Sequence, residues 1–191
     1  NALKAFFGQT ANVVYHLVRG EDERPVVPLH EAKSIGAEET FPLNLTDTDE
    51  MRTMLTALAD RVGSRLRQEK LAAWTITLKL RYGNFQTMTR QRKLVNPTQA
   101  DEVIYRTAWE LLVQQPNLSA GIRLLGISAS HFEPAKRYEA ALFDDREEKG
   151  RHISSVMDRM REKFGPAALV PGRLATMKKQ RKEDERKDEQ E

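Results

Sequence analysis

The residues best suited to chemistry lie in one stretch, residues 71–100, which contains no Asp or Glu. Its five cations are Lys79, Arg81, Arg90, Arg92 and Lys93. Such a cluster favours phosphate groups, because each cation that neutralises a nucleic-acid phosphate releases condensed counterions. Hydroxyl groups that can donate hydrogen bonds to phosphate oxygens come from Thr75, Thr77, Thr87 and Thr89. The stretch therefore predicts a local positive surface that contacts the backbone of a nucleic acid.

Small residues in two other stretches would allow a phosphate to approach closely. They are Ser34, Gly36, Gly126, Ser128 and Ser130. We place them on the outer strands of a sheet, where backbone N–H groups with little side-chain obstruction are available as donors. Asn or Gln residues positioned to read a base edge are not conspicuous, so we expect contacts to the backbone without reading of the bases. The alternative interpretation is an ordinary solvated sheet face.

Composition excludes several other kinds of site. Among 191 residues there are 31 Lys and Arg against 28 Asp and Glu, so the net charge is only +3 and a basic surface must be local. The absence of cysteine excludes disulfides, thiolate zinc sites and thiol nucleophiles, and it fits a reducing cytoplasmic location. The four histidines lack metal-binding spacing, and common catalytic motifs are missing. No apolar run approaches the length of a membrane span. We therefore expect neither catalysis nor a membrane partner.

The elements that must position these residues include four predicted strands. Residues 33–41 alternate between apolar and polar side chains, as a strand with one buried face does. Residues 75–94 predict a β-hairpin with a two-residue connection at Gly83 and Asn84. Residues 122–132 predict the last strand.

Two amphipathic helices are predicted between the strands. The first runs from about residue 48 to 70. Thr98 and Asp101 resemble a capping box that begins a second helix, which ends near Gln115. The order β-α-β-β-α-β predicts an α+β fold, in which a four-stranded antiparallel sheet carries both helices on one face and leaves the other bare.

The remaining segments are predicted to be attachments to this sheet domain. The helical pattern near the N-terminus is interrupted at Gly8, and a further helix is predicted at 152–164. The predicted division of the chain is a helical remnant at 1–20, a tether at 21–32, the sheet domain at 33–133, a linker with one helix at 134–172, and a charged, disordered tail at 173–191.

Three motifs together resemble the little finger domain of Y-family DNA polymerases, most closely those of DNA polymerase IV type. The motifs are KSIGAEETF at 33–41, TITLKLRYGNFQTMTRQRKL at 75–94 and GIRLLGISASHF at 121–132. The stretch FFGQTANVVYHLVRGEDERPV at 6–26 is similar to the end of the thumb domain and the tether that follows it. The resemblance covers most of the chain before residue 133.

This resemblance implies a domain that grips duplex primer-template DNA in an error-prone polymerase, which acts in translesion synthesis and DNA repair. The implied phosphate contacts are Ser34, Gly36, Thr40, Thr89, Arg90, Arg92, Arg123 and Gly126. Lys79, Arg81 and Ser128 join them on residue chemistry. The faces predicted from alternation agree with the implied contacts except at Arg123, which has the parity of the buried face.

The resemblance also indicates what the chain lacks. Palm and fingers have no counterpart, so we expect this chain to be inactive alone and to hold no cofactor, while Mg²⁺ is expected for the parent polymerase. In YEAALF, at 138–143, Leu142 and Phe143 resemble the anchor of a clamp-binding peptide, without its usual leading glutamine. A sliding clamp is therefore a candidate partner, and packing of this pair on its own domain is the alternative.

Two other classes of function stay open. An RNA-binding sheet of similar topology would need exposed aromatic residues on its central strands, and Tyr82 is predicted to lie on the apolar face. A protein-interaction fragment would act through the tail and the Leu142–Phe143 pair. Binding of duplex DNA is the leading hypothesis.

Overall fold

The computed structural model describes residues 2–26, 32–135 and 145–175, and the chain divides into two compact units, Asn1–Ala32 and Lys33–Glu191. The first unit contains α1 (Ala2–Phe7), a 3-10 turn (Gly8–Thr10) and α2 (Ala11–Leu17). Gly8 has a φ of 53°, which interrupts the helix where the sequence predicts it. The second unit contains the sheet and the candidate site.

The sheet of the second unit has four strands in the order β1-β4-β2-β3. They are β1 (Ser34–Leu45), β2 (Leu71–Tyr82), β3 (Thr87–Thr98) and β4 (Ile122–Pro134). All three pairings are antiparallel, which confirms the predicted fold class. β4 lies between β1 and β2, so the prediction that both β1 and β4 are outer strands is wrong for β4.

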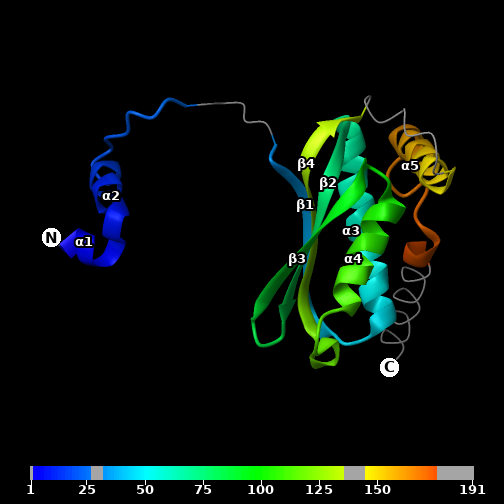
Figure 1. Ribbon diagram of the computed structural model, residues 1–191, viewed down its shortest axis with the longest axis horizontal. Helices are drawn as coiled ribbons and strands as arrows, with labels where there is room; N and C mark the ends of the chain where they lie inside the picture. Colours follow the sequence, from blue (N-terminus) through cyan, green and yellow to red (C-terminus); the bar gives the residue numbers. More distant parts are fainter. Residues whose placement is uncertain (1, 27–31, 136–144, 176–191) are drawn as a thin grey trace, which may run out of the picture. The chain divides into compact units, whose positions relative to one another are not determined.

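Two helices, α3 (Thr48–Gln68) and α4 (Asp101–Val113), cover one face of the sheet (Figure 1). Asp47 caps α3 by accepting a hydrogen bond from the Asp49 backbone N–H at 3.2 Å. Between the helices and the sheet lies one apolar core, whose fully buried side chains include Leu55, Leu58, Leu66, Ile76, Leu78, Leu80, Ile104, Leu112, Leu125 and Ile127. Burial of this face leaves the opposite face of the sheet as the candidate site.

The connection between β2 and β3 differs from the predicted two-residue turn. It contains residues 83–86, closed by hydrogen bonds from the Tyr82 N–H to the Gln86 carbonyl and from the Phe85 N–H to the Tyr82 carbonyl, both 2.9 Å. The Asn84 carboxamide oxygen accepts from the Gln86 N–H at 3.0 Å, and Phe85 takes a left-handed φ of 66°. The Asn84 side chain supplies a local partner that favours the longer turn over a two-residue one.

The start of α4 also differs from the prediction. Ala100 is the N-cap residue, and its N–H donates to the Thr98 hydroxyl at 3.1 Å. The Asp101 carboxylate accepts hydrogen bonds from Arg67 on α3, at 2.7 Å and 3.4 Å. The predicted capping box is therefore wrong, because Asp101 binds a cation on another helix.

A fifth helix, α5 (Asp145–Phe164), begins earlier than the predicted residue 152 and packs on α3 and α4 through polar groups. Ser154 donates to Asp101 at 2.8 Å, Arg67 donates to Asp158 at 2.5 Å, and Arg161 donates to Asp60 at 2.8 Å. Its apolar stripe is mostly solvent-exposed, including Ile153, Met160 and Phe164. Within the three described ranges, no helix is long and apolar enough to cross a membrane.

Candidate nucleic-acid interface

The open face of the sheet, opposite α3 and α4, is built from four rows of residues. In an antiparallel sheet, residues paired across strands lie on the same face, so the register defines each row. The rows are Ser34–Ser130–Thr75–Lys93, Gly36–Ser128–Thr77–Gln91, Glu38–Gly126–Lys79–Thr89 and Thr40–Leu124–Arg81–Thr87. Hydroxyl groups, glycines and three cations therefore share one surface, which we call the open face.

Eight of the predicted DNA-binding residues lie on the open face: Ser34, Gly36, Thr40, Lys79, Arg81, Thr89, Gly126 and Ser128. Arg81 donates from Nε to the Thr87 hydroxyl at 2.8 Å, which holds its guanidinium over the sheet. Gly126 is buried beneath the Glu38–Lys79 ion pair, whereas the other seven are at least partly exposed and available to one extended ligand. Their role as contacts stays a prediction.

The edge strand β1 presents backbone groups beside this face. A Cβ atom added to Gly36 would lie 3.1 Å from the Ser128 Cβ, closer than ordinary Cβ contacts, so the glycine lets β1 approach β4 tightly here. The Gly36 carbonyl accepts a hydrogen bond from Arg65 of α3 at 2.8 Å, as a group directed away from β4 can. Backbone donors are therefore expected at β1, whereas β4 amides lie between two ladders.

Lys79 forms an ion pair with Glu38 across β4. Its Nζ lies 2.8 Å from Glu38 Oε2, and Gly126 is the residue between them in the row. A hollow of about 250 Å³ opens here, lined by Gly36, Ala37, Glu38, Lys79, Gly126, Ile127 and Ser128. An anion as small as a phosphate can enter this hollow, since glycine leaves its floor without a side chain.

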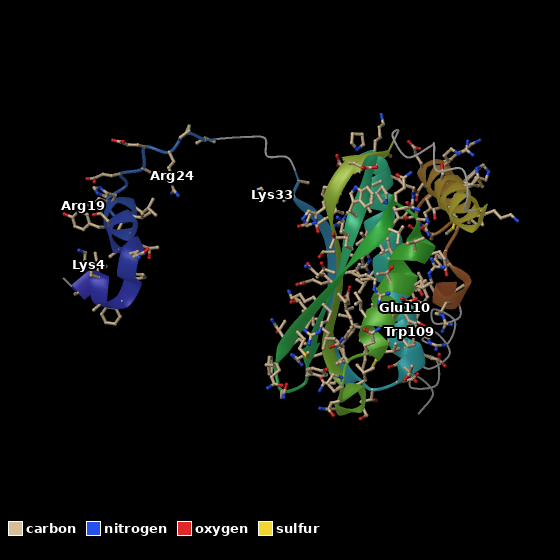
Figure 2. All side chains as sticks on the ribbon, in the orientation of Figure 1. Lys4, Arg19, Arg24, Lys33, Trp109 and Glu110 are labelled. Carbon is tan, nitrogen blue, oxygen red and sulfur yellow. The ribbon has the colours of Figure 1, made fainter. Side chains whose placement is uncertain are left out.

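Arg90 and Arg92 do not share the open face. The register pairs Arg90 with Leu78 and Arg92 with Ile76, both core residues, so the face predicted for these two arginines is wrong. Arg92 forms an ion pair with Glu110 of α4, which is labelled on that helix in Figure 2. Arg90 is exposed and donates to the Thr89 carbonyl at 2.9 Å. Strand alternation explains the error, because Thr89 and Arg90 are neighbours and must point to opposite faces.

Arg123 lies at an irregularity in β4. The pairing with β2 shifts between Arg81 and Tyr82, and residue 123 has no register partner on β1 or on β2. Its guanidinium carbon lies 5.1 Å from the centre of the Phe85 ring, at the end of the hairpin. A bulge of this kind re-aims a side chain, and it explains why the parity of Arg123 did not match the implied contact.

The register also brings in Gln91, which the sequence prediction did not name, and it assigns Lys93, one of the five predicted cations, to the same face. Gln91 and Lys93 both lie on the open face and are exposed. The apolar residues Met88 and Leu94 were the available signal in the sequence, because their even positions assign the odd-numbered residues of β3 to the other face; the structure packs both against the core.

The Mg²⁺ expected for the parent polymerase has no donor set in the described ranges. No group of three or more His, Asp or Glu side chains there is arranged to hold a metal ion. Leu142 and Phe143, the candidate clamp anchor, lie outside the described residues.

Comparison with known proteins now gives the family. A model of the impB/mucB/samB family C-terminal domain matches residues 32–142, the segment that contains the whole sheet. The chain belongs to the impB/mucB/samB family. Its resemblance to Y-family DNA polymerases of DNA polymerase IV type is thereby confirmed.

Two named relatives match the chain over a longer stretch than the sheet domain alone. DNA polymerase IV of Desulfatibacillum aliphaticivorans is 35% identical over 177 residues, which cover 91% of this chain and 45% of that protein. DNA polymerase IV of Brucella melitensis biotype 1 is 37% identical over 172 residues, covering 90% of this chain and 38% of that protein. The chain thus spans about two fifths of the length of these curated relatives.

Proposed function

We propose that this chain is the DNA-binding little finger region of an error-prone polymerase of DNA polymerase IV type, and that it grips duplex primer-template DNA through the phosphate backbone. The observation that carries the proposal is the open face, where Lys79, Arg81 and Lys93 lie among hydroxyl groups and glycines. Long cations attract the phosphates, and short donors let them approach closely. Named relatives are DNA polymerases, which supports DNA as the ligand.

The composition of the open face argues against an RNA-binding sheet. None of its four rows contains an aromatic side chain, and Tyr82 is buried on the helix side. Sheets that bind single-stranded RNA stack bases on exposed aromatic residues. A duplex backbone is therefore the better ligand for this surface.

Nucleotidyl transfer would belong to parts of the parent protein outside this chain. We propose that the parent uses Mg²⁺ for that reaction in translesion synthesis and DNA repair, in the cytoplasm where the DNA is accessible, and that this chain positions the duplex. The chain alone is then expected to bind DNA without extending a primer.

A sliding clamp is the second proposed partner, through Leu142 and Phe143. The support is the resemblance of YEAALF to a clamp-binding peptide. The test measures binding of the full chain to a purified clamp ring, with Leu142→Ala plus Phe143→Ala as the comparison. An unchanged affinity would remove the clamp from the proposal.

The DNA-binding proposal is tested by removing the cations of the open face together. Fluorescence anisotropy with a labelled primer-template duplex at two salt concentrations compares the wild type with a Lys79→Ala, Arg81→Ala, Lys93→Ala variant. Each phosphate contact adds about 0.9 to the slope of log affinity against log salt, so the variant should lose up to about 2.7 of slope.

A control variant removes the same charge from the helices. Arg106 on α4 and Arg159 and Lys163 on α5 are exposed, and their replacement by Ala lowers the net charge equally. We expect the control to keep most of the wild-type affinity, because these cations do not lie on the open face. Equal losses in both variants would show attraction by net charge alone and would refute the proposed surface.

A further inference from the structure

The open face carries one acidic side chain in its four rows, Glu38 of β1. It is exposed, with 54% of its side chain accessible. A carboxylate is unfavourable on a surface that binds phosphates, since like charges repel at short range. Its position therefore requires an explanation beyond phosphate attraction.

Glu38 is paired with Gly126 of the adjacent strand β4, and its carboxylate reaches across that strand to Lys79, two strands away. The row places Gly126 of β4 between them, and the ion pair closes over this glycine at 2.8 Å. A Cβ atom on Gly126 would lie 2.9 Å from the Glu38 Cβ, closer than atoms pack. The bridge thus depends on the missing side chain at position 126.

The carboxylate also borders the place that a phosphate would use. Glu38, Lys79, Gly126 and Ser128 line the same hollow, so an anion bound to Lys79 there meets the Glu38 oxygens. Binding then either breaks the Lys79–Glu38 ion pair or leaves two anions side by side. Both outcomes lower the net gain from Lys79.

We propose that Glu38 is an intramolecular competitor for the DNA phosphate at Lys79, which weakens the grip of the open face and speeds release of the duplex. The inference rests on the proposed function and adds a residue that limits affinity. Lys79 exchanges one carboxylate for one phosphate, so little net charge is gained there on binding. The remaining cations of the face are Arg81, which contacts the Thr87 hydroxyl, and Lys93, whose Nζ lies 6.0 Å from the centre of the Trp74 ring. Within the described ranges neither forms an ion pair with a carboxylate, so these two supply the attraction.

The adjacent residue provides a matched control. Glu39 follows Glu38 on β1 and pairs with Leu125, a core residue, so it lies on the opposite face. It forms an exposed ion pair of its own, with Arg61 of α3 at 3.1 Å. Glu39→Gln therefore removes the same charge, the same type of ion pair and the same side-chain shape, away from the proposed phosphate position.

The test measures duplex affinity of the full chain for the wild type, Glu38→Gln and Glu39→Gln. Glu38→Gln should bind the labelled duplex about threefold to tenfold more tightly at low salt, and its salt slope should steepen by up to about 0.9. Glu39→Gln should change affinity by less than about twofold, as expected for a charge outside the interface.

Two results would overturn the inference, and they differ from failure of the proposed function. If the wild type binds duplex and Glu38→Gln binds no more tightly than Glu39→Gln, the competitor role is wrong and the DNA-binding face stands. If neither the wild type nor Glu38→Gln binds, both proposals are wrong.

A double-mutant cycle with Lys79→Met separates competition from general repulsion. If Glu38 acts through Lys79, the gain from Glu38→Gln must shrink when Lys79 is replaced. An equal gain in both backgrounds would show that Glu38 only repels DNA through its charge, and the competitor role would be rejected.

Discussion

Arg92 of β3 forms an ion pair with Glu110 of α4, and this contact draws its guanidinium to the helix-covered side of the sheet. The pair is partly exposed, with 35% of the Arg92 side chain and 46% of the Glu110 side chain accessible. The next residue, Lys93, lies on the open face and is exposed. Two neighbouring cations of the hairpin are therefore placed on opposite faces, with different partners.

This arrangement predicts unequal effects on DNA binding. Lys93→Ala should weaken duplex affinity severalfold and lower the salt slope by about 0.9, the loss of one phosphate contact. Arg92→Ala should leave the slope nearly unchanged, because its charge already has a carboxylate partner. Anisotropy titrations at several salt concentrations measure both. A larger loss for Arg92→Ala would favour the contact that the family resemblance implies.

Arg67 joins three helices and should be important for stability. Its side chain is only 9% exposed and bonds Asp101 of α4 and Asp158 of α5, and these hydrogen bonds raise its pKa although burial alone would lower it. Arg67→Met leaves Asp101 without its cation and leaves Asp158 with only Arg161, 4.0 Å away, so we expect a loss of about 3 kcal/mol in the free energy of unfolding. Urea unfolding followed by circular dichroism measures this loss.

The control for Arg67 is Arg61, six residues earlier on α3. Its ion pair with Glu39 is about half-exposed at both ends, so Arg61→Met should cost less than about 1 kcal/mol. Similar losses of stability in the two variants would show that the buried ion pairs of Arg67 stabilise the fold no more than the exposed pair of Arg61.

We expect the Asp101 carboxyl to make the protein more stable as pH falls, whereas the carboxylate of an ordinary exposed ion pair makes it less stable. Burial raises its pKa above the usual 3.8, despite hydrogen bonds from Arg67 and Ser154. The folded protein therefore binds this proton more tightly than the unfolded chain. The resulting stabilisation is complete below pH 3.8 and is lost as pH rises through the folded-state pKa. The wild type should gain stability relative to Asp101→Asn as pH falls from 7 toward 4, measured by urea unfolding. A constant difference would contradict this.

Gly126 should tolerate no side chain. The Cβ of Gly126→Ala would lie 2.9 Å from the Glu38 Cβ, so β1 must move or the Glu38 side chain must shift. We expect a loss of about 1–3 kcal/mol in stability, as for other overpacked sites, and weaker duplex binding as the hollow fills. Thermal unfolding and anisotropy test the two effects separately.

Gly150 supplies the matched glycine. It lies within α5, and a Cβ there would meet nothing within 4 Å. Gly150→Ala should leave DNA binding unchanged and raise stability by up to about 1 kcal/mol, since alanine favours helix. If both substitutions destabilise the protein, close packing at Gly126 does not explain the effect of Gly126→Ala.

The architecture could be predicted from the sequence because its signals are local. Alternation along β1 and β2 and the apolar stripe of α3 each depend on one segment, and the order of elements then leaves few topologies. The interior position of β4 could not be read in this way, because strand order depends on contacts between distant segments. Backbone donors were therefore predicted on a strand that has neighbours on both sides.

The candidate site was predictable in composition but not in placement. Lys79 and Arg81 follow a clean alternation in β2, and both lie on the predicted face. β3 has cations on both faces, and its pairing with β2 across the four-residue turn assigns Arg90 and Arg92 to one side and Lys93 to the other. The Glu38–Lys79 bridge joins residues 41 positions apart, and no local pattern indicates it.

The polar attachment of α5 has a thermal consequence. The helix packs through Ser154, Asp158 and Arg161, and the core cluster contains no described α5 side chain. Detaching such a surface hydrates mainly polar groups, which lowers heat capacity, whereas opening an apolar core raises it. Cooling weakens the apolar contact between the sheet and helices α3 and α4. It should have little effect on the polar contact between α5 and these helices, so the two interfaces of this unit respond differently to temperature.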